Sequence, residues 1–233
     1  MNTWQYAVFR NVRTFGAKGD GIADDSDAIN LAAVSKAPCD ADCGNSFSRP
    51  NIIYFPPGTY KICKPIVQYY YSQFVGHATN RPTIKGCATY SGSALIETDP
   101  LVPDGNGAVW YKTRHQFLRQ IRNIIFDLRE MGDGNGNNVP TGINWQVAQS
   151  ASLHNLDFLM ETADGSRSHV GINTVNGAGG FASDLKFIGG NIGWHAGLKQ
   201  YTARSISFSG CSIAVQVEWD WGFNFHGVCD HSP

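Results

Sequence analysis

The sequence of 233 residues has little charge of either sign and no long apolar run. Charged residues make up 16% of the chain and the formal net charge is −1, so no basic surface for nucleic acid or for anionic membranes is indicated. No apolar stretch approaches the ~20 residues that a helix needs to cross a bilayer. We therefore expect a neutral partner, and neither a nucleic acid nor a membrane.

Cysteine is sparse, yet its 6 residues are more than a reducing cytosol favours and too few for a disulfide-dense miniprotein. Cys39 and Cys43 lie in a polar loop, which predicts a local bridge. No second Cys or His pair follows at zinc-finger spacing, and we expect no metal and no cofactor. The amino-terminal residues MNTWQYAVFR show no basic segment followed by an apolar core. We expect a secreted, extracellular protein in its mature form.

What the sequence does contain is 26 glycines and many Asn, Ser and Thr residues, a composition that suits a β-rich body with many turns. Near the amino terminus, from Phe9 to Ala32, lies an aspartate-rich stretch, FRNVRTFGAKGDGIADDSDAINLA. A calcium loop counted from Asp20 would need glutamate where Leu31 stands, and the Gly-Lys-Ser/Thr ending of a phosphate loop is missing. The stretch instead predicts a helix from about Ser26 to Lys36, capped by Asp24 or Asp25.

A repeated strand pattern dominates the rest of the chain. After expected strands at 52–55 and from 59 onward, four segments share the order polar, polar, aliphatic, any residue, phenylalanine: IRNIIFDL, LHNLDFLM, ASDLKFIGG and ARSISFSGC. Their aliphatic residues are Ile124, Leu156, Leu185 and Ile206. Because strands recur at periods of twenty to fifty residues without helix signals between them, we predict an all-β, right-handed parallel β-helix over residues 1–233, with the aliphatic residues stacked in one interior column.

The two ends of this β-helix are expected to differ. The aspartate-capped helix covers the first coil, whereas the last segment, VQVEWDWGFNFHGVCDHSP, shows no polar helix or capping strand. Uncovered strand edges invite association. We therefore expect that the last coil continues into a longer protein or is buried in an oligomer.

Several segments carry a family resemblance: VFRNVRTFGAKGDGIADDSDAIN, IIYFPPGTYKI, PIVQYYYSQFVGHA, GINWQVAQSASLHNL, GAGGFASDLKF and WDWGF. From about Trp4 to Phe225 the chain resembles the amino-terminal β-helix of the fungal β-1,3-glucanases of glycoside hydrolase family 55. The first two segments are generic among pectate-lyase-like β-helices, and the others are more specific. The resemblance implies two β-helical domains with glucan between them, inverting hydrolysis from the non-reducing end, and a catalytic glutamate in the second domain, which this chain does not reach.

The resemblance also implies that this first domain helps to hold substrate and the attacking water. Carried over by motif, Gln146 and Gln149 are the amide candidates and Ser183 is the hydroxyl candidate. The family tends to have a serine where this chain has Ala178, in Asn-Gly-Ala-Gly-Gly. If that serine holds the water, Ala178 cannot.

The residues themselves offer one carboxyl pair for glycosidic cleavage, Glu218 and Asp220. On one face of a strand they would lie ~6.6 Å apart, within the range for an inverting enzyme. Alternation alone also explains them as solvated residues. Trp219 and Trp221 would then face inward, although outward rings would suit a sugar platform. A complete small enzyme using this pair therefore remains an alternative.

Aromatic and amide side chains are the remaining signal, because rings stack on sugars and amides bond to hydroxyls. In the run from Tyr69 to Tyr71 at least one ring, such as Tyr70, should be exposed, and Trp145 neighbours the Gln146 motif. We expect β-1,3-glucan binding, as half of an exo-β-1,3-glucanase that is inactive alone. A non-catalytic, oligomerising β-helix stays open, and so does a calcium-dependent polysaccharide lyase built on Asp127, Asp157 and Asp184, although these occupy different registers.

Overall fold

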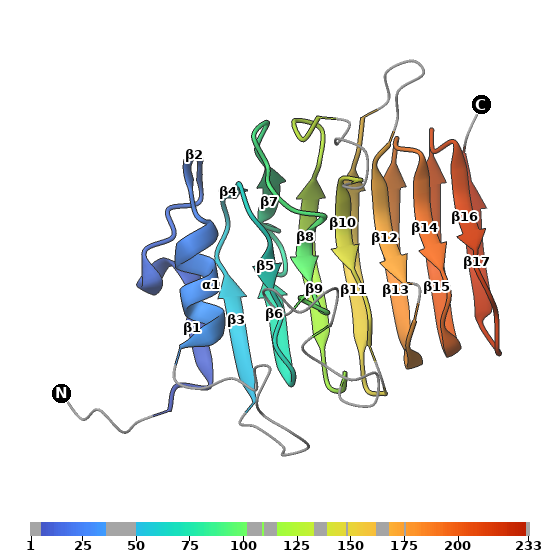
Figure 1. Ribbon diagram of the computed structural model, residues 1–233, viewed down its shortest axis with the longest axis horizontal. Coiled ribbons are helices and arrows are strands. Elements are labelled where there is room, and N and C mark those ends of the chain that lie inside the picture. Colours follow the sequence, from blue (N-terminus) through green and yellow to red (C-terminus); the bar gives the residue numbers. More distant parts are fainter. Residues whose placement is uncertain are drawn as a thin grey trace.

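The computed structural model describes residues 6–35, 50–101, 109, 116–132, 139–147, 149–161, 168–174 and 176–231. Within them the chain coils into two parallel sheets, as predicted. An 11-stranded sheet, here called sheet A, has the main order β1-β3-β6-β9-β11-β13-β15-β17, with β2, β4 and β7 beside it. A 6-stranded sheet B has the order β16-β14-β12-β10-β8-β5. Strands stand side by side along the long axis in sequence order (Figure 1), so the chain forms a parallel β-helix.

The elements have these bounds: β1 Phe9–Asn11, η1 Val12–Phe15, β2 Asp20–Asp24, α1 Ser26–Val34, β3 Asn51–Phe55, β4 Thr59–Ile62, β5 Ile66–Val67, β6 Ser72–Gly76, β7 Thr83–Gly86, β8 Ala94–Glu97, β9 Gln120–Asp127, β10 Thr141–Asn144, β11 Ser152–Leu159, β12 Val170–Thr174, β13 Ala178–Ile188, β14 Ile192–Ala196, β15 Lys199–Ser209, β16 Ile213–Val217 and β17 Asn224–Asp230. The predicted strands at 52–55 and from 59 onward correspond to β3 and β4. In the described part of the chain, no helix is long and apolar enough to span a bilayer.

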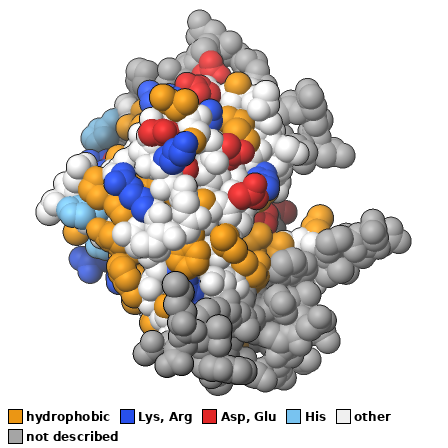
Figure 2. Space-filling model, turned by 90° about the vertical axis from the view of Figure 1, so that its left-hand side faces the viewer, with side chains coloured by type: hydrophobic (Ala, Val, Ile, Leu, Met, Phe, Trp, Pro, Cys, Tyr) orange, Lys and Arg blue, Asp and Glu red, His pale blue; other side chains and the backbone are white. Residues whose placement is uncertain are grey.

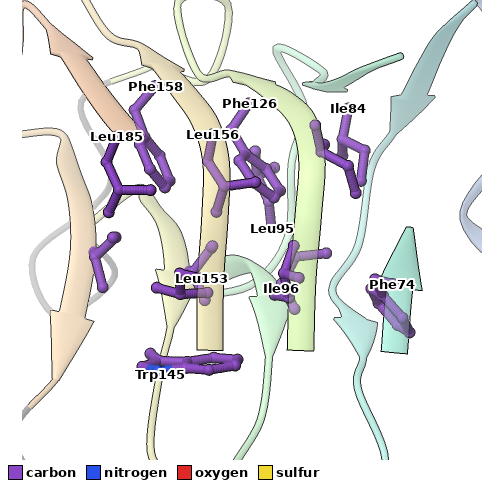
Figure 3. Close-up of a cluster of buried hydrophobic side chains, with 14 of the residues drawn as sticks. Phe74, Ile84, Leu95, Ile96, Phe126, Trp145, Leu153, Leu156, Phe158 and Leu185 are labelled. Atoms are coloured by element: carbon purple, nitrogen blue, oxygen red, sulfur yellow. The ribbon is translucent and has the colours of Figure 1, made fainter. Parts of the chain in front are cut away.

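The predicted interior column is confirmed. Leu156 pairs in register with Ile124 on one side and Leu185 on the other, and Leu185 pairs with Ile206. The phenylalanines two residues further on stack face to face with ring centroids 4.8 to 5.2 Å apart: Phe126, Phe158, Phe187 and Phe208. Figure 3 shows part of this packing, with Trp145 at its base. One strand spacing per coil brings identical side chains together.

Sheet A bends at one residue in each of its longer strands. At this bend each strand has one residue at positive φ, between 52° and 61°: Asn123, Asn155, Asp184, Ser205 and Gly227. Short polar side chains and glycine tolerate this left-handed conformation better than other residues. The Asn155 amide also donates to the Asn123 side chain at 2.9 Å, so the corner is hydrogen-bonded from coil to coil. The bend divides each strand into two halves that face different directions.

Helix α1 covers the first coil and begins at Ser26 as predicted, but it ends at Val34. Its inward residues Ile29, Ala32 and Ala33 are buried. Asp24 accepts the Ser26 amide at 3.0 Å, which confirms one of the two proposed caps. The other aspartate, Asp25, accepts amides of the preceding loop instead.

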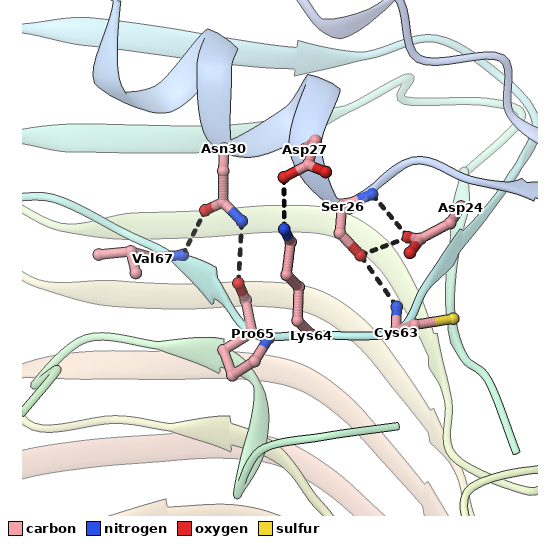
Figure 4. A network of polar contacts seen from close by, with 8 residues as sticks. All are labelled: Asp24, Ser26, Asp27, Asn30, Cys63, Lys64, Pro65 and Val67. Carbon is pink, nitrogen blue, oxygen red and sulfur yellow. Dashed lines mark hydrogen bonds and ion pairs between the residues drawn. The ribbon is translucent and has the colours of Figure 1, made fainter. Parts of the chain in front are cut away.

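Polar side chains of α1 satisfy the edge of the coil beneath it (Figure 4). Asn30 donates to the Pro65 carbonyl at 2.9 Å and accepts the Val67 amide at 3.0 Å, as a neighbouring strand would. Ser26 Oγ accepts the Cys63 amide at 2.9 Å. Seen from this end, charged side chains lie among apolar ones (Figure 2). The helix therefore covers an edge that would otherwise be open.

A disulfide joins Cys63 to Cys87, with 5.2 Å between their Cα atoms. It links the corner after β4 to the end of β7 in the next coil. The predicted bridge between Cys39 and Cys43 lies outside the described residues. Spacing alone did not indicate the pair that the coil brings together.

Candidate functional site

The outer side of sheet B carries a continuous row of polar side chains. Its in-register members are Glu97, Asn144, Asn173, His195 and Gln216. The Asn144 amide donates to Glu97 at 2.7 Å, and the Asn173 amide donates to Asn144 at 3.3 Å. His195 Nδ1 lies 3.0 Å from the Asn173 oxygen. From Glu97 to His195 the row is thus a chain of hydrogen bonds running across the coils.

A surface pocket of about 470 Å³ lies beside this row. It is lined by small polar and aliphatic side chains: Ser93, Val139, Thr141, Ser168, Val170, Asn173, Asn191, Ile192 and His195. None of these residues is acidic, and hydroxyl and amide groups predominate among its polar ones. Such a lining suits a neutral ligand rich in hydroxyl groups.

The sequence analysis missed this row, although a signal for it exists. The segments TGIN, VGIN and IGWH place Asn144, Asn173 and His195 at the same position after a glycine. In each coil that glycine approaches a phenylalanine ring: a Cβ on Gly171 would lie 2.6 Å from the Phe187 ring. The repeat therefore combines an interior packing requirement with an outward polar residue.

Glu218 and Asp220 follow β16 in a bend, so the expectation that they share one face of a strand is wrong. Strand β16 ends at Val217. Glu218 Oε2 lies 3.1 Å from His195 Nε2, and Asp220 accepts the Phe223 amide at 2.6 Å. Glu218 therefore extends the polar row by one member, whereas Asp220 holds the turn.

The expectation that Trp219 and Trp221 face inward is also wrong. Trp221 is 66% exposed and Trp219 is half-buried. Their ring centroids are 6.2 Å apart at a near-perpendicular angle. Lys199 Nζ lies 4.4 Å from the Trp221 ring centroid, within cation–π range. The corner next to the polar row thus presents aromatic surface of the kind on which sugar rings stack.

The two glutamine candidates lie at the corner that follows sheet B. Gln146 is half-buried beside Thr98, whose hydroxyl oxygen accepts a hydrogen bond from the Gln146 backbone N–H at 2.8 Å. Gln149 is exposed and contacts Gly179 of the next coil. Trp145, between them and β10, is fully buried, so its ring is not available as a sugar platform.

Tyr70 is likewise buried, at 7% exposure, and packs edge-on against Phe117. The run from Tyr69 to Tyr71 forms a loop before β6, so strand alternation does not apply to it, and Tyr71 is the half-exposed member. The expectation that Tyr70 presents its ring to a ligand is therefore wrong.

Ser183 lies on sheet A, and its contact there is with His154. His154 Nδ1 is 2.6 Å from Ser183 Oγ and 3.3 Å from Asp184 Oδ2. A catalytic triad needs the nucleophile and the carboxylate on opposite ring nitrogens. Because both contacts involve Nδ1, this group is not arranged as a triad.

The aspartates considered for a calcium lyase do not converge. Asp127 pairs with Arg129, and Asp157 pairs with Arg81. Asp184 contacts His154. Among the described residues, no group of three or more His, Cys, Asp and Glu side chains is placed to hold a metal ion.

A buried acidic pair at the start of the polar row was not predicted. Burial raises the pKa of the Glu97 carboxyl, and it raises the pKa of Asp99 to about 6. Glu97 Oε1 accepts the Asp99 amide, and the Gln116 side chain donates to Asp99 at 2.8 Å. Sequence spacing could not reveal their burial, which depends on the neighbouring coils.

Comparison with known proteins decides the family. The sequence model of the family described as rhamnogalacturonase A/epimerase, pectate lyase-like, matches residues 9–231. The chain belongs to this pectate lyase-like family. The A-module of mannuronan C-5 epimerase AlgE6 from Azotobacter vinelandii shares its fold, with a TM-score of 0.57 and 15% identity over 96% of this chain and 56% of that module.

Three curated relatives each align with 96% of this pectate lyase-like chain. A probable glucan endo-1,3-beta-glucosidase of Arthroderma benhamiae is 45% identical, and a glucan 1,3-beta-glucosidase of Cochliobolus carbonum is 36% identical. The non-secreted LysM effector LysM19 of Penicillium expansum is 42% identical. The chain spans 25%, 28% and 17% of their lengths, respectively. The resemblance to fungal β-1,3-glucanases is thereby confirmed.

Proposed function

We propose that this chain recognises a β-1,3-glucan with the outer side of sheet B and the adjoining Trp219–Trp221 corner. One observation carries the proposal. A hydrogen-bonded row of side chains leads from a pocket lined by hydroxyl and amide groups to the corner where Trp221 is exposed. Two of the relatives bear glucan-cleaving names, which supports glucan as the ligand.

We further propose that the chain acts as the amino-terminal half of an inverting exo-β-1,3-glucanase, with the catalytic acid outside it. Glu218 is already hydrogen-bonded to His195, and Asp220 is bonded to a backbone amide of its own turn. Both carboxyls thus have structural partners. Gln146 and Gln149 remain candidates for contacts to substrate and water, because they lie at the corner beside the polar row.

The last coil supplies a candidate surface for that second half. Every residue of β17 is exposed, and apolar side chains are uncovered in both strands of this coil, among them Val217 of β16 at 55% and Val228 of β17 at 40%. We propose that a second β-helical domain covers this coil, or otherwise a second copy of the chain. Analytical ultracentrifugation of the chain distinguishes the two, because only self-association raises its mass with concentration.

We also propose that the protein is extracellular. The disulfide between Cys63 and Cys87 supports this, since such bonds persist in oxidising compartments. Because one relative is named a non-secreted effector, fractionation of the native producer is the test. Recovery of the protein only from cell lysate would refute this part.

Affinity electrophoresis in gels containing laminarin, a β-1,3-glucan, tests the ligand. The chain should be retarded, and Trp221→Ala should lose most of that retardation. Phe181→Ala is the matched control, because Phe181 is another exposed aromatic, at 49%, on sheet A. Equal retardation of both variants and the parent chain would refute the proposed surface.

A reducing-sugar assay on the same substrate tests the catalytic part. The chain alone should release no glucose. Release that is abolished by Glu218→Gln or by Asp220→Asn would show instead that the chain is a complete enzyme using this pair.

A further inference from the structure

A row of two arginines, two histidines and a serine lies on sheet A, away from the proposed glucan surface. In register along β9, β11, β13, β15 and β17 stand Arg122, His154, Ser183, Arg204 and His226. The residues before the first four point inward, because Ile121, Leu153, Ala182 and Ala203 are fully buried, and Phe225 before His226 is 36% exposed. By strand alternation the row itself faces outward.

A pocket of about 490 Å³ lies at one end of this row. Its lining is Thr202, Arg204, Ser205, His226 and Gly227. It therefore combines a guanidinium, an imidazole and two hydroxyls, with no carboxylate. Within the part of the chain that the structure describes, neither Arg204 nor His226 forms an ion pair. The carboxylate of Asp184, in the coil before Arg204, lies 3.3 Å from His154 instead.

We propose that this pocket is an oxyanion site, which binds a carboxylate, sulfate or phosphate group between Arg204 and His226. Adjacent strands are ~4.8 Å apart, so side chains at paired positions can contact the oxygens of one anion. Arginine presents several N–H donors in a planar fork that matches such oxygens. The Thr202 and Ser205 hydroxyls supply further donors. The site is independent of the proposed glucan surface.

The distance between the two arginines of the row distinguishes a free small anion from an anionic group on a polymer. Arg122 lies three strand steps from Arg204, about 14 Å, so no single small anion reaches both. A linear acidic polysaccharide along the row would contact both arginines. Arg122 therefore separates a free anion from an anionic group carried on a polymer.

Titration of the chain with inorganic phosphate, followed by NMR, tests the site, and affinity electrophoresis in polygalacturonate tests the polymer. Arg204→Gln should weaken phosphate binding about tenfold, because a hydrogen bond to a charged group is lost. Lys18→Gln is the control: it removes one positive charge from an exposed side chain near β2, at the opposite end of the coil (Figure 1). Arg204 is exposed, so its variant should fold like the parent chain, which a thermal melt checks.

The variants at the two arginines give distinct results. Phosphate binding that is weakened by Arg204→Gln but not by Arg122→Gln supports the site. Loss of polygalacturonate retardation in Arg122→Gln then identifies a polymer as the source, and unchanged retardation identifies a free anion. Phosphate binding by Arg204→Gln equal to that of Lys18→Gln would overturn the proposal, as would an equal loss in Arg122→Gln.

Discussion

Each end of the coil presents a strand edge with unpaired backbone groups, and the two ends differ in what covers that edge. At the first coil, Asn30 and Ser26 of α1 bond to the backbone of the corner below, and Arg10 donates to the Ala32 and Ala33 carbonyls at the end of the helix. At the last coil, β17 is exposed along its whole length. The interior pattern also differs, because Asp230 stands in register with Phe208 in the last coil, whereas Tyr60 and Ile84 continue the apolar position toward the first coil.

The phenylalanine ladder from Phe126 to Phe208 and the helix that covers the first coil are therefore separate parts of the fold. A phenylalanine in the middle of the ladder stacks on rings of the coils on both sides, whereas Phe225 of the last coil is in register with a single described strand, at Ala203. Edge strands left open in this way are sites of association. If covering an edge matters, the same kind of substitution should cost more unfolding free energy in a covered coil than in the exposed last coil.

The largest effect is expected from truncating the phenylalanine ladder in its middle. Phe187 is 1% exposed and stacks on Phe158 and Phe208. Phe187→Ala should lower the free energy of unfolding by about 3–5 kcal/mol, because a cavity replaces the buried ring. Denaturant unfolding monitored by circular dichroism measures the loss.

A phenylalanine of the last coil that lies outside the ladder serves for comparison, because Asp230 occupies the ladder position there. Phe225 is 36% exposed, although its ring stacks on Phe223 at 4.4 Å. Phe225→Ala should therefore cost less than half as much as Phe187→Ala. Equal losses would mean that the last coil is as well packed as the middle, which would contradict this expectation.

The second effect concerns the disulfide near the covered end. Cys63 and Cys87 are separated by 24 positions, and removing a bridge that closes such a loop costs about 3 kcal/mol in the chain-entropy account. The double variant Cys63→Ser, Cys87→Ser should show that loss in denaturant unfolding under oxidising conditions. Cys229→Ser in the last coil, where the thiol is free and exposed, should match the parent chain. A double variant as stable as the parent would contradict the expectation.

A smaller effect is expected from making the covered end resemble the open one. Asn30→Leu keeps the side-chain size but leaves the Pro65 carbonyl and the Val67 amide without their partner. This should cost about 1–3 kcal/mol of unfolding free energy. The same change at Asn224 in β17, whose amide makes only a 3.4 Å contact to Gly222, should cost far less. If both variants lose the same amount, the edge contacts of α1 contribute nothing specific.

The sequence predicted the parts of the fold that repeat. A column such as Ile124, Leu156, Leu185 and Ile206 is visible because each coil must present the same side chain to its neighbours. The helix start was visible for the same kind of reason, since Asp24 caps an amide two residues away. Both are local or periodic requirements that single residues report.

The site was less accessible, because it depends on where a strand stops. Alternation extended past Val217 placed Trp219 and Trp221 inside, yet Asp220 and Gly222, the latter at φ 82°, make a turn there. The Asp-x-Gly order is itself a turn signal that should have ended the strand. The burial of Tyr70 and Asp99, by contrast, depends on contacts between coils that no local pattern contains.

The smallest effect concerns the pH dependence of the unfolding free energy, to which the buried carboxyl of Asp99 contributes. Burial raises the pKa of Asp99 to about 6, above its value in the unfolded chain, so the folded protein binds the proton more tightly. Stability contributed by this proton is present at low pH and is lost as pH rises toward 6, and the carboxylate then destabilises the fold. Asp99→Asn, which can still accept from Gln116, should flatten this slope and add about 1 kcal/mol at neutral pH. A residual slope is expected because burial also raises the pKa of Glu97. Denaturant unfolding across pH 4 to 8 compares Asp99→Asn with the parent chain, and a slope as steep as that of the parent chain would contradict the assignment.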